Sequence, residues 1–338
     1  MGKKKGKKGK GKKNAVVGPS ADILRENYRK ACNLIGEEQS EDVLNIIDTH
    51  IGEGQVLTQL CIGDVPLGPA GVRCVAAGLM GELPGMEEGT YLNLTNLHFW
   101  RCAAKDDGTI ALAKLIMNEN KDFKLGVLDL MDNQVGLRGC MALGKALADG
   151  ANRSLLHLSL NANALDAKCV GALAEGLMSN STLKKLSLEY CKLGPDCGPM
   201  LGGILASAKT GLSKMKLKGN HLRCDGLQFL ALSLRRNKAL TELDLEDNEI
   251  GGFPPNLNDI QILANLAASL AENQTLTTLN LNMNPLADAG AEALKEGVAG
   301  NKTLTALNVD ISLPEVLFDS LYRAGGKKKK GKKKKKKK

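Results

Sequence analysis

One nine-residue pattern recurs along most of this chain and constrains its fold more than any other feature. The pattern is L-x-x-L-x-L-x-x-N, and the first copy with every position filled runs from Leu125 to Asn133. Later copies begin at Leu155, Leu183, Leu212, Leu240, Leu276 and Leu304, and two degenerate copies, read from Leu57 and Leu92, precede them. Self-similarity at such a period indicates a solenoid, in which each unit packs only on its neighbours. We therefore expect about nine stacked units.

The second half of each unit is equally regular. Apolar residues four apart, such as Leu173 and Leu177, share one face of a helix. An asparagine then follows, as at Asn180, Asn237, Asn273 and Asn301. Asparagine tolerates the left-handed conformation that ends many helices, so we expect these residues to be left-handed caps rather than glycan acceptors.

The combined unit resembles the ribonuclease-inhibitor-like leucine-rich repeats, over about residues 55–312. The resemblance implies an α/β solenoid shaped like a horseshoe, with parallel strands on the concave face and helices on the convex face. It also implies a ladder of asparagine side chains that bond the backbone from repeat to repeat. Cys191 occupies one asparagine slot, where its thiol is a weaker donor.

We divide the chain into five segments. They are a Lys/Gly-rich tail over 1–19, a helical cap over 20–52, the solenoid over 53–312, a cap helix over 313–326, and a polylysine tail over 327–338. A stack of repeats needs polar lids, which explains the caps. Ser312 and Glu315 have the spacing of a capping box at the start of the last helix.

The formal net charge of +9 conceals an acidic body. The two tails hold 8 and 11 of the 46 basic residues, which leaves 27 basic against 37 acidic side chains between them. Blocks of like charge favour disorder, and polylysine binds polyanions by releasing counterions, without reading sequence. The candidate polyanion-binding residues are Lys3, Lys4, Lys5, Lys327, Lys328, Lys332 and Lys338. Tubulin tails, nucleic acid, an anionic membrane surface and the acidic body itself are the alternative ligands.

The strand segments predict which side chains line the concave face, because the leucines point inward and the residues between them point out. Lys214, Lys216 and Lys218 should therefore lie beside the acidic row Glu242, Asp244, Glu246 and Asp247. One interpretation is mutual neutralisation, and the other is a charged stripe that orients a partner.

An insertion lengthens the unit that begins at Leu240, around the segment 251–259. Pro254 and Pro255 disfavour regular structure there, and we expect Phe253 and Leu257 to be exposed. Insertions in repeat proteins map to loops and often bind partners, although a tolerated loop is the alternative.

Nothing in the sequence indicates catalysis, a cofactor, a metal or a small-molecule substrate. Gly139 to Ala146 has the spacing of a phosphate-binding loop, but Ala146 lacks the required hydroxyl and the stretch belongs to a repeat helix. The four histidines have no metal-ligand spacing, and Trp100 is interpreted as packing at an irregular joint. Nine scattered cysteines favour reduced thiols of the cytosolic type. No stretch has the length of a membrane span or signal peptide.

Lysine-glycine ends are also similar to those of ciliary and flagellar axoneme components. The leading hypothesis is a non-enzymatic scaffold of a cytoskeletal assembly, located in the cytoplasm or the axoneme. A nuclear or ribosome-associated protein that binds nucleic acid through its tails is the second hypothesis. A regulator of a GTPase that acts through the concave face is the third, although the related GTPase activator ends in an acidic segment and this chain ends in lysines.

Overall fold

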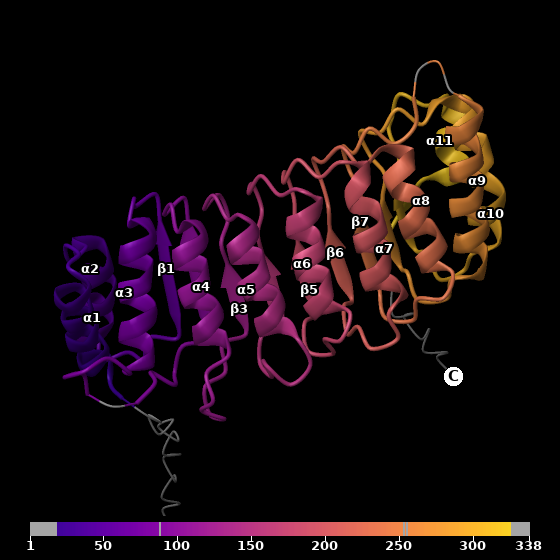
Figure 1. Cartoon of the computed structure of the whole chain (residues 1–338). Helices are drawn as coiled ribbons and strands as arrows, with labels where there is room; N and C mark the ends of the chain where they lie inside the picture. The colour runs from indigo at the N-terminus through magenta and orange to yellow at the C-terminus, as the bar shows by residue number, and fades with distance from the viewer. Residues whose placement is uncertain (1–18, 88, 253, 255, 326–338) are drawn as a thin grey trace, which may run out of the picture.

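The computed structural model describes residues 19–87, 89–252, 254 and 256–325, which form one continuous solenoid. The strands make a single sheet in chain order, with β1 to β9 parallel and β10 antiparallel to β9. Figure 1 shows the helices side by side in one layer, with the strands in a second layer behind them. Strands are spaced at about 4.8 Å and packed helices at 8–10 Å, so the stack curves with its strands on the concave side.

The strands of the described residues are short; each repeat contributes one of β1 to β9, and β10 follows the last helix. They are β1 (Gln59–Gly63), β2 (Asn96–Trp100), β3 (Val127–Asp129), β4 (His157–Ser159), β5 (Lys185–Ser187), β6 (Lys214–Lys216), β7 (Glu242–Asp244), β8 (Thr278–Asn280), β9 (Ala306–Asn308) and β10 (Arg323–Ala324).

The helices of the same residues precede or follow these strands. They are α1 (Ala21–Ile35), α2 (Glu41–Gly52), α3 (Gly68–Met80), α4 (Lys105–Ile116), α5 (Leu137–Leu147), α6 (Ala167–Leu177), α7 (Gly198–Ala206, after the short 3-10 helix Pro195–Cys197), α8 (Arg223–Leu234), α9 (Leu257–Glu272), α10 (Ala287–Gly300) and α11 (Glu315–Leu321).

The register of the sheet confirms the predicted solenoid and its nine units. Leu186, Met215 and Leu243 occupy the same position in successive strands and are fully buried. Leu173 and Leu177 on α6 are buried as well, against the strand layer. The leucines of the pattern therefore form the core between the two layers.

The second repeat lies two residues later than the sequence pattern predicted. Leu97 pairs with Leu128, so Leu94 rather than Leu92 holds the first position of that unit. Phe99 and Cys102 fill positions that other repeats give to leucine and asparagine. These substitutions concealed the register, although Leu94, Phe99 and Cys102 are all buried as the pattern requires.

The asparagine ladder is present. Asn163 donates from its amide nitrogen to the Leu130 oxygen of the preceding repeat at 2.9 Å, and its amide oxygen accepts from the Asn133 and Val135 backbone at 3.0 and 2.9 Å. Equivalent contacts tie Asn133, Asn220 and Asn284 to their preceding repeats. Cys191 continues the ladder only with its thiol, which donates to the Leu160 oxygen at 3.2 Å. The predicted weaker donor is therefore in place.

The asparagines after the helices do not act as left-handed caps. Asn273 and Asn301 have extended backbones, with φ of −73° and −80°. Their amide nitrogens donate to carbonyls at the end of the helix in the preceding repeat, as from Asn180 after α6 to Leu147 at the end of α5 at 2.6 Å. Their amide oxygens accept from the backbone two and three residues ahead. These residues form a second ladder, which satisfies helix-end carbonyls from the next repeat, and this bridging role requires extended backbone.

The two ends of the stack are covered differently. The helices α1 and α2 lie before the first strand, and Leu24, Tyr28 and Ile47 are buried there. At the other end, α11 begins at Glu315 and β10 follows it. Ser312 does not form the predicted capping box, because the residue before Pro314 is disfavoured in helical conformation and the helix starts after the proline.

The stretch that resembles a phosphate-binding loop is helical and packs against its neighbour. A Cβ on Gly144 would lie 2.1 Å from the Ala172 oxygen, and one on Gly176 would lie 1.9 Å from the Gly144 oxygen. The glycines of α5 and α6 therefore permit close helix packing, and the stretch forms no loop that could surround a phosphate.

Candidate partner-binding surface

The lysine row and the acidic row lie on adjacent strands, as the repeat spacing predicted. In the register of β6 and β7, Lys214 pairs with Glu242 and Lys216 with Asp244. Lys214 Nζ lies 2.7 Å from a Glu242 oxygen, and Lys216 Nζ lies 2.5 Å from Glu242 and 3.1 Å from Asp244. Lys218 Nζ lies 2.8 Å from Glu246. We call these six side chains the paired rows.

The paired rows are partly buried, so each charge in them needs its partner to offset the cost of losing contact with water. Burial alone would lower the pKa of Lys216, but Glu242 and Asp244 outweigh that effect and raise it. Burial would likewise raise the pKa of Glu242, but Lys214 and Lys216 lower it overall. Removing either row would leave charges in a half-desolvated position without partners, so the rows stabilise the sheet as a unit.

The acidic side of the paired rows continues toward the C-terminus. Glu246 accepts from the Asn280 amide at 2.7 Å as well as from Lys218, and both contacts hold its pKa below its usual range. Asp247, the last acidic residue predicted for this row, is half-buried in the turn after β7 and takes no part in the ion pairs of the paired rows. Asp247 is therefore the one acidic residue predicted for this row that Lys214, Lys216 and Lys218 do not neutralise.

Tyr190 is the residue of this face that the sequence analysis did not place in the site. It follows β5 with a positive φ of 56°, and its side chain is 51% exposed. Its ring covers the backbone of Gly219 in the next repeat, where a Cβ would lie 2.2 Å from the ring. Tyrosine gives large contact area at low entropic cost, so it is a common anchor in interfaces. Its position in the turn slot before Cys191 is the signal that identifies it.

The insertion after β7 differs in part from the predicted loop. Leu257 is 86% exposed, as expected, but it is the first residue of α9, so the last residues of 251–259 are helical. Asn256 caps this helix by accepting from the Asp259 backbone at 2.8 Å. The extra residues therefore partly lengthen α9. Phe253 lies outside the described residues.

A second polar cluster lies on the concave face near the N-terminal end. Trp100 donates from its ring nitrogen to Asp129 at 2.8 Å, and the imidazole of His98 lies 3.6 Å from the same carboxylate. Burial opposes the charge of Asp129, but these neighbours outweigh it and lower its pKa. Trp100 also packs over Gly63, so it fills a place between strands as predicted while its edge holds a carboxylate.

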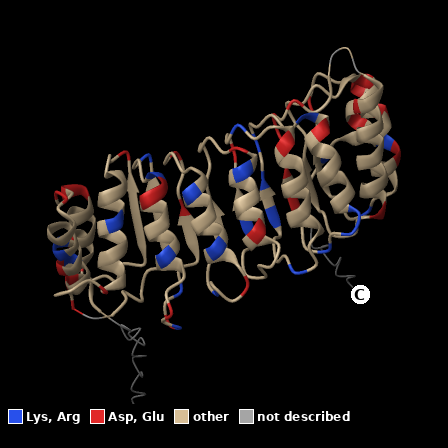
Figure 2. Ribbon diagram, in the orientation of Figure 1, with Lys and Arg blue, Asp and Glu red and all other residues tan. Residues whose placement is uncertain are grey.

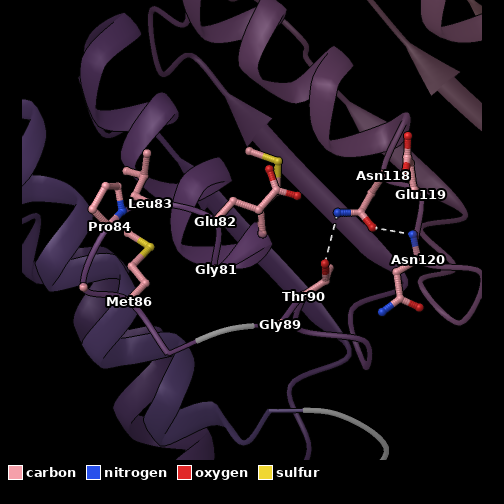
Figure 3. Close-up of a pocket in the computed structure, with 12 residues that line it drawn as sticks. Gly81, Glu82, Leu83, Pro84, Met86, Gly89, Thr90, Asn118, Glu119 and Asn120 are labelled. Carbon is pink, nitrogen blue, oxygen red and sulfur yellow. Dashed lines mark hydrogen bonds between the residues drawn. The ribbon is translucent and has the colours of Figure 1, made fainter.

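A hollow of about 650 Å³ opens between the segment after α3 and the turn after α4. Figure 3 shows Asn118 in the hollow, where it donates to Thr90 Oγ1 at 3.0 Å and accepts from the Asn120 backbone at 2.9 Å. Its described lining contains two ionisable side chains, Glu82 and Glu119, and the Thr90 hydroxyl, which accepts from Asn118. These hydrogen bonds hold the turn after α4 in place.

Three further observations concern the described part of the chain. No group of three or more histidine, cysteine, aspartate or glutamate side chains there is placed to hold a metal ion. None of its helices is long and apolar enough to cross a bilayer. The nine cysteines are free thiols, and Cys61 is the exposed one. The predicted polyanion-binding lysines of both tails lie outside the described residues.

Comparison with known proteins agrees with the repeat architecture. The family model described as Leucine Rich repeat matches residues 122–144, 179–196, 236–252 and 272–295. The chain is similar to mouse NACHT, LRR and PYD domains-containing protein 12, with 30% identity over 212 residues, which cover 62% of this chain and 19% of that protein. It is similar to pig ribonuclease inhibitor, with 24% identity over 309 residues, which cover 75% of this chain and 64% of the inhibitor.

Among solved structures, the fold is similar to that of Leiomodin-1 Actin-Binding Site 2, with a TM-score of 0.36 and 19% identity. That match covers 48% of this chain and 88% of the solved one. The chain spans about a fifth of the NACHT relative and under two thirds of the inhibitor, so the similarity concerns the repeats.

Proposed function

We propose that this chain, which belongs to the ribonuclease-inhibitor-like leucine-rich repeat proteins, is a non-enzymatic scaffold that binds another protein through its concave face. The proposed contact region comprises the paired rows, Asp247 and Tyr190, and the sequence adds Leu257 of the insertion and Phe253, which lies outside the described residues, as further candidates. Protein interaction is the coarse function that the repeat family supports. The contact region itself is our proposal.

The observation that carries this proposal is the position of Tyr190 beside the paired rows. A half-exposed tyrosine lies next to two adjacent strand segments whose lysines and carboxylates pair with one another across one strand spacing. The aromatic ring supplies buried area in a complex, and the ordered charges restrict the orientation of the partner. A partner with an acidic side facing β6 and a basic side facing β7 would match this pattern.

The finer part of the proposal concerns location. We infer a structural subunit of a cytoskeletal assembly, in the cytoplasm or a ciliary or flagellar axoneme, whose lysine-rich ends bind acidic surfaces such as tubulin tails. The 8 and 11 lysines of the two ends support attraction to polyanions of any kind. In this arrangement the repeats select the partner and the tails strengthen the attachment.

The contact region is tested by reversing its polarity without breaking its ion pairs. In this variant Lys214, Lys216 and Lys218 become acidic, while Glu242, Asp244 and Glu246 become lysine. The net charge and the number of pairs stay the same, so the protein should fold. Loss of partners from a pull-down in ciliated cells, with Tyr190→Ala as a second variant, would support recognition through this face. Retention of every partner would restrict the paired rows to a structural role.

Location is tested with three tagged versions in a ciliated cell: the full chain, residues 20–325, and the two tails fused to an inert protein. The scaffold proposal expects residues 20–325 to reach a ciliary or microtubule structure without the tails. If only the tails are localised, and they enter the nucleus, the proposal is wrong and a nucleic-acid-binding role replaces it.

A further inference from the structure

A second surface lies at the edge of the sheet where each helix ends and the next strand begins. The loops at this edge are joined in sequence by backbone hydrogen bonds. Lys184 donates to the Leu156 oxygen at 2.8 Å, Ser213 to the Lys184 oxygen at 2.9 Å, and Thr241 to the Ser213 oxygen at 2.8 Å. Side chains from four successive repeats are therefore held next to one another.

These loops are basic. The segments 148–156, 178–184, 207–213 and 235–241 contain one acidic residue, Asp149. Their basic residues are Arg153, Lys184, Lys209, Arg235, Arg236 and Lys238, all of them exposed. Arg235 is paired with Glu272, and the other five take part in no ion pair among the residues that the structure describes. We call these five residues the basic edge, and Figure 2 shows blue segments along the lower rim of the stack.

The basic edge is not explained by the helices that end there. Helix C-termini carry partial negative charge, which nearby cations stabilise. However, α9 and α10 end at the same edge, and the loops after them contain no basic residue over 273–277 and Lys302 alone over 301–305. The concentration of cations after α5 to α8 therefore exceeds what a helix end requires.

A hollow of about 1130 Å³ lies at the N-terminal end of the basic edge. It opens between the turn after α4 and the turn after α5, and Lys121, Lys124 and Arg153 contribute to its lining. Leu156, which is 44% exposed, supplies an apolar wall. Glu119 lines the hollow as well, so three basic side chains and one carboxylate lie beside its apolar side.

The neighbouring strand ends extend the positive surface onto the concave face. His157, Lys185 and Lys214 occupy the same position in β4, β5 and β6. Burial lowers the pKa of His157, and the charges of Lys185 and Lys214 lower it further. Lys214 is paired with Glu242, so Lys185 supplies the positive charge that an acidic ligand would meet on this side.

We propose that the basic edge binds a short acidic peptide segment of a partner protein, with an apolar side chain of that segment seated in the hollow beside Leu156. The edge spans three repeat spacings, about 14 Å at the strands and about 27 Å at the helices. An extended chain of roughly five to eight residues covers that distance at about 3.3 Å per residue.

The charge distribution favours a short peptide over a nucleic acid. Residues 151–240 contain 13 basic and 5 acidic side chains, whereas residues 241–325 contain 3 basic and 13 acidic ones. Residues 19–150 contain 11 basic and 19 acidic side chains. A long polyanion would therefore be repelled beyond both ends of the edge. The four loops also lack phenylalanine, tyrosine and tryptophan, the side chains on which single-stranded bases stack.

The test measures how tightly the full chain binds a fluorescent octapeptide that consists of glutamate, aspartate and one leucine. Binding is measured by fluorescence anisotropy in about 50 mM salt. The variant K184E/K209E/K238E changes the edge. The variant K114E/K145E/K168E makes the same charge change at exposed positions on α4, α5 and α6, and it keeps both tails. An oligo-dT of matched charge serves as the second probe.

We expect the edge variant to weaken peptide binding about tenfold and the matched variant less than twofold. A photo-crosslinking group on the leucine should label the segments around Arg153 and Leu156. Equal weakening by both variants, or crosslinks to the tails alone, would overturn the proposal. If the edge variant loses binding of the oligo-dT as well as of the peptide, the edge is assigned to nucleic acid instead. If the triple variant does not fold, K209Q and L156S give the same comparison with smaller changes.

Discussion

Two sets of lysines lie within one repeat of each other and have opposite surroundings. On β6, Lys216 is 21% exposed and lies within 3.1 Å of the carboxylates of two residues, Glu242 and Asp244. At the basic edge, Lys184 and Lys209 are exposed, and no carboxylate of the described residues forms an ion pair with them. The same residue type thus neutralises its neighbours in one place and leaves a positive surface in the other.

The difference comes from the residue one repeat away. In a solenoid, side chains at the same position in successive units lie about 4.8 Å apart on the strand side. Lys216 has Asp244 at that position, whereas Lys185, the strand residue next to Lys184 of the basic edge, has Lys214. Whether a charged row is available to a partner therefore depends on the sequence about 28 residues further along the chain, as well as on its own exposure.

The largest effect that tests this comparison is expected from Lys216→Glu. The substitution places a third carboxylate beside Glu242 and Asp244 in a partly buried position. We expect a loss of about 2–4 kcal/mol in the free energy of unfolding, measured by denaturant titration, because like charges replace two ion pairs.

The matched control is Lys209→Glu at the basic edge, where we expect a change below about 0.5 kcal/mol. Both substitutions reverse one charge, so they differ in surroundings alone. Equal effects at the two sites would mean that the paired rows contribute no specific stability.

Exchanging the charges of Lys218 and Glu246 measures the interaction energy of that one ion pair, and we expect a smaller effect than that of Lys216→Glu. Lys218→Glu and Glu246→Lys should each destabilise the fold by about 1–2 kcal/mol, and the double variant should recover about 1 kcal/mol of the sum. The measurement is a double-mutant cycle at low and high salt. Simple additivity of the two single changes would contradict the contact of 2.8 Å between Lys218 and Glu246.

The sequence predicted the layers, the register of most repeats and the pairing of the two charged rows. All three follow from one property, the fixed offset between equivalent positions. Leu125, Leu155 and Leu183 mark that offset, and whatever stands between the leucines is then placed beside its counterpart in the next unit. The second repeat was placed wrongly because Phe99 and Cys102 departed from the consensus residues.

Features that depend on the path of a loop were not predicted. Asn180 was assigned a local backbone role, but its amide reaches the Leu147 carbonyl of the preceding repeat, a contact that no local pattern encodes. The hollow beside Leu156 arises from the relative positions of two turns with different lengths.

The pH dependence of stability gives a third, weaker test. Lys218 lowers the pKa of Glu246, so this carboxylate stabilises the fold above its unfolded-state pKa, and the contribution is lost as pH falls through the folded-state pKa. Replacing Lys218 by glutamine should cost about 0.5–1 kcal/mol at pH 7 and nearly nothing at about pH 3. Thermal unfolding against pH measures this. Lys209→Gln at the basic edge is the control, and a pH-dependent loss of the same size there would contradict the comparison.

The smallest effect has the opposite sign. Lys185 lies in register between His157 and Lys214, so part of the charge on this row repels itself. Lys185→Gln should therefore raise the free energy of unfolding by about 0.2–0.5 kcal/mol in low salt, because like charges on neighbouring strands destabilise a sheet. About 0.5 M salt should remove the gain, since the screening length falls below the strand spacing. Lys168→Gln on α6 is the matched neutralisation and should change little. If Lys185→Gln destabilises the fold as Lys218→Gln does, Lys185 has a partner on this chain and is not free to bind an acidic segment.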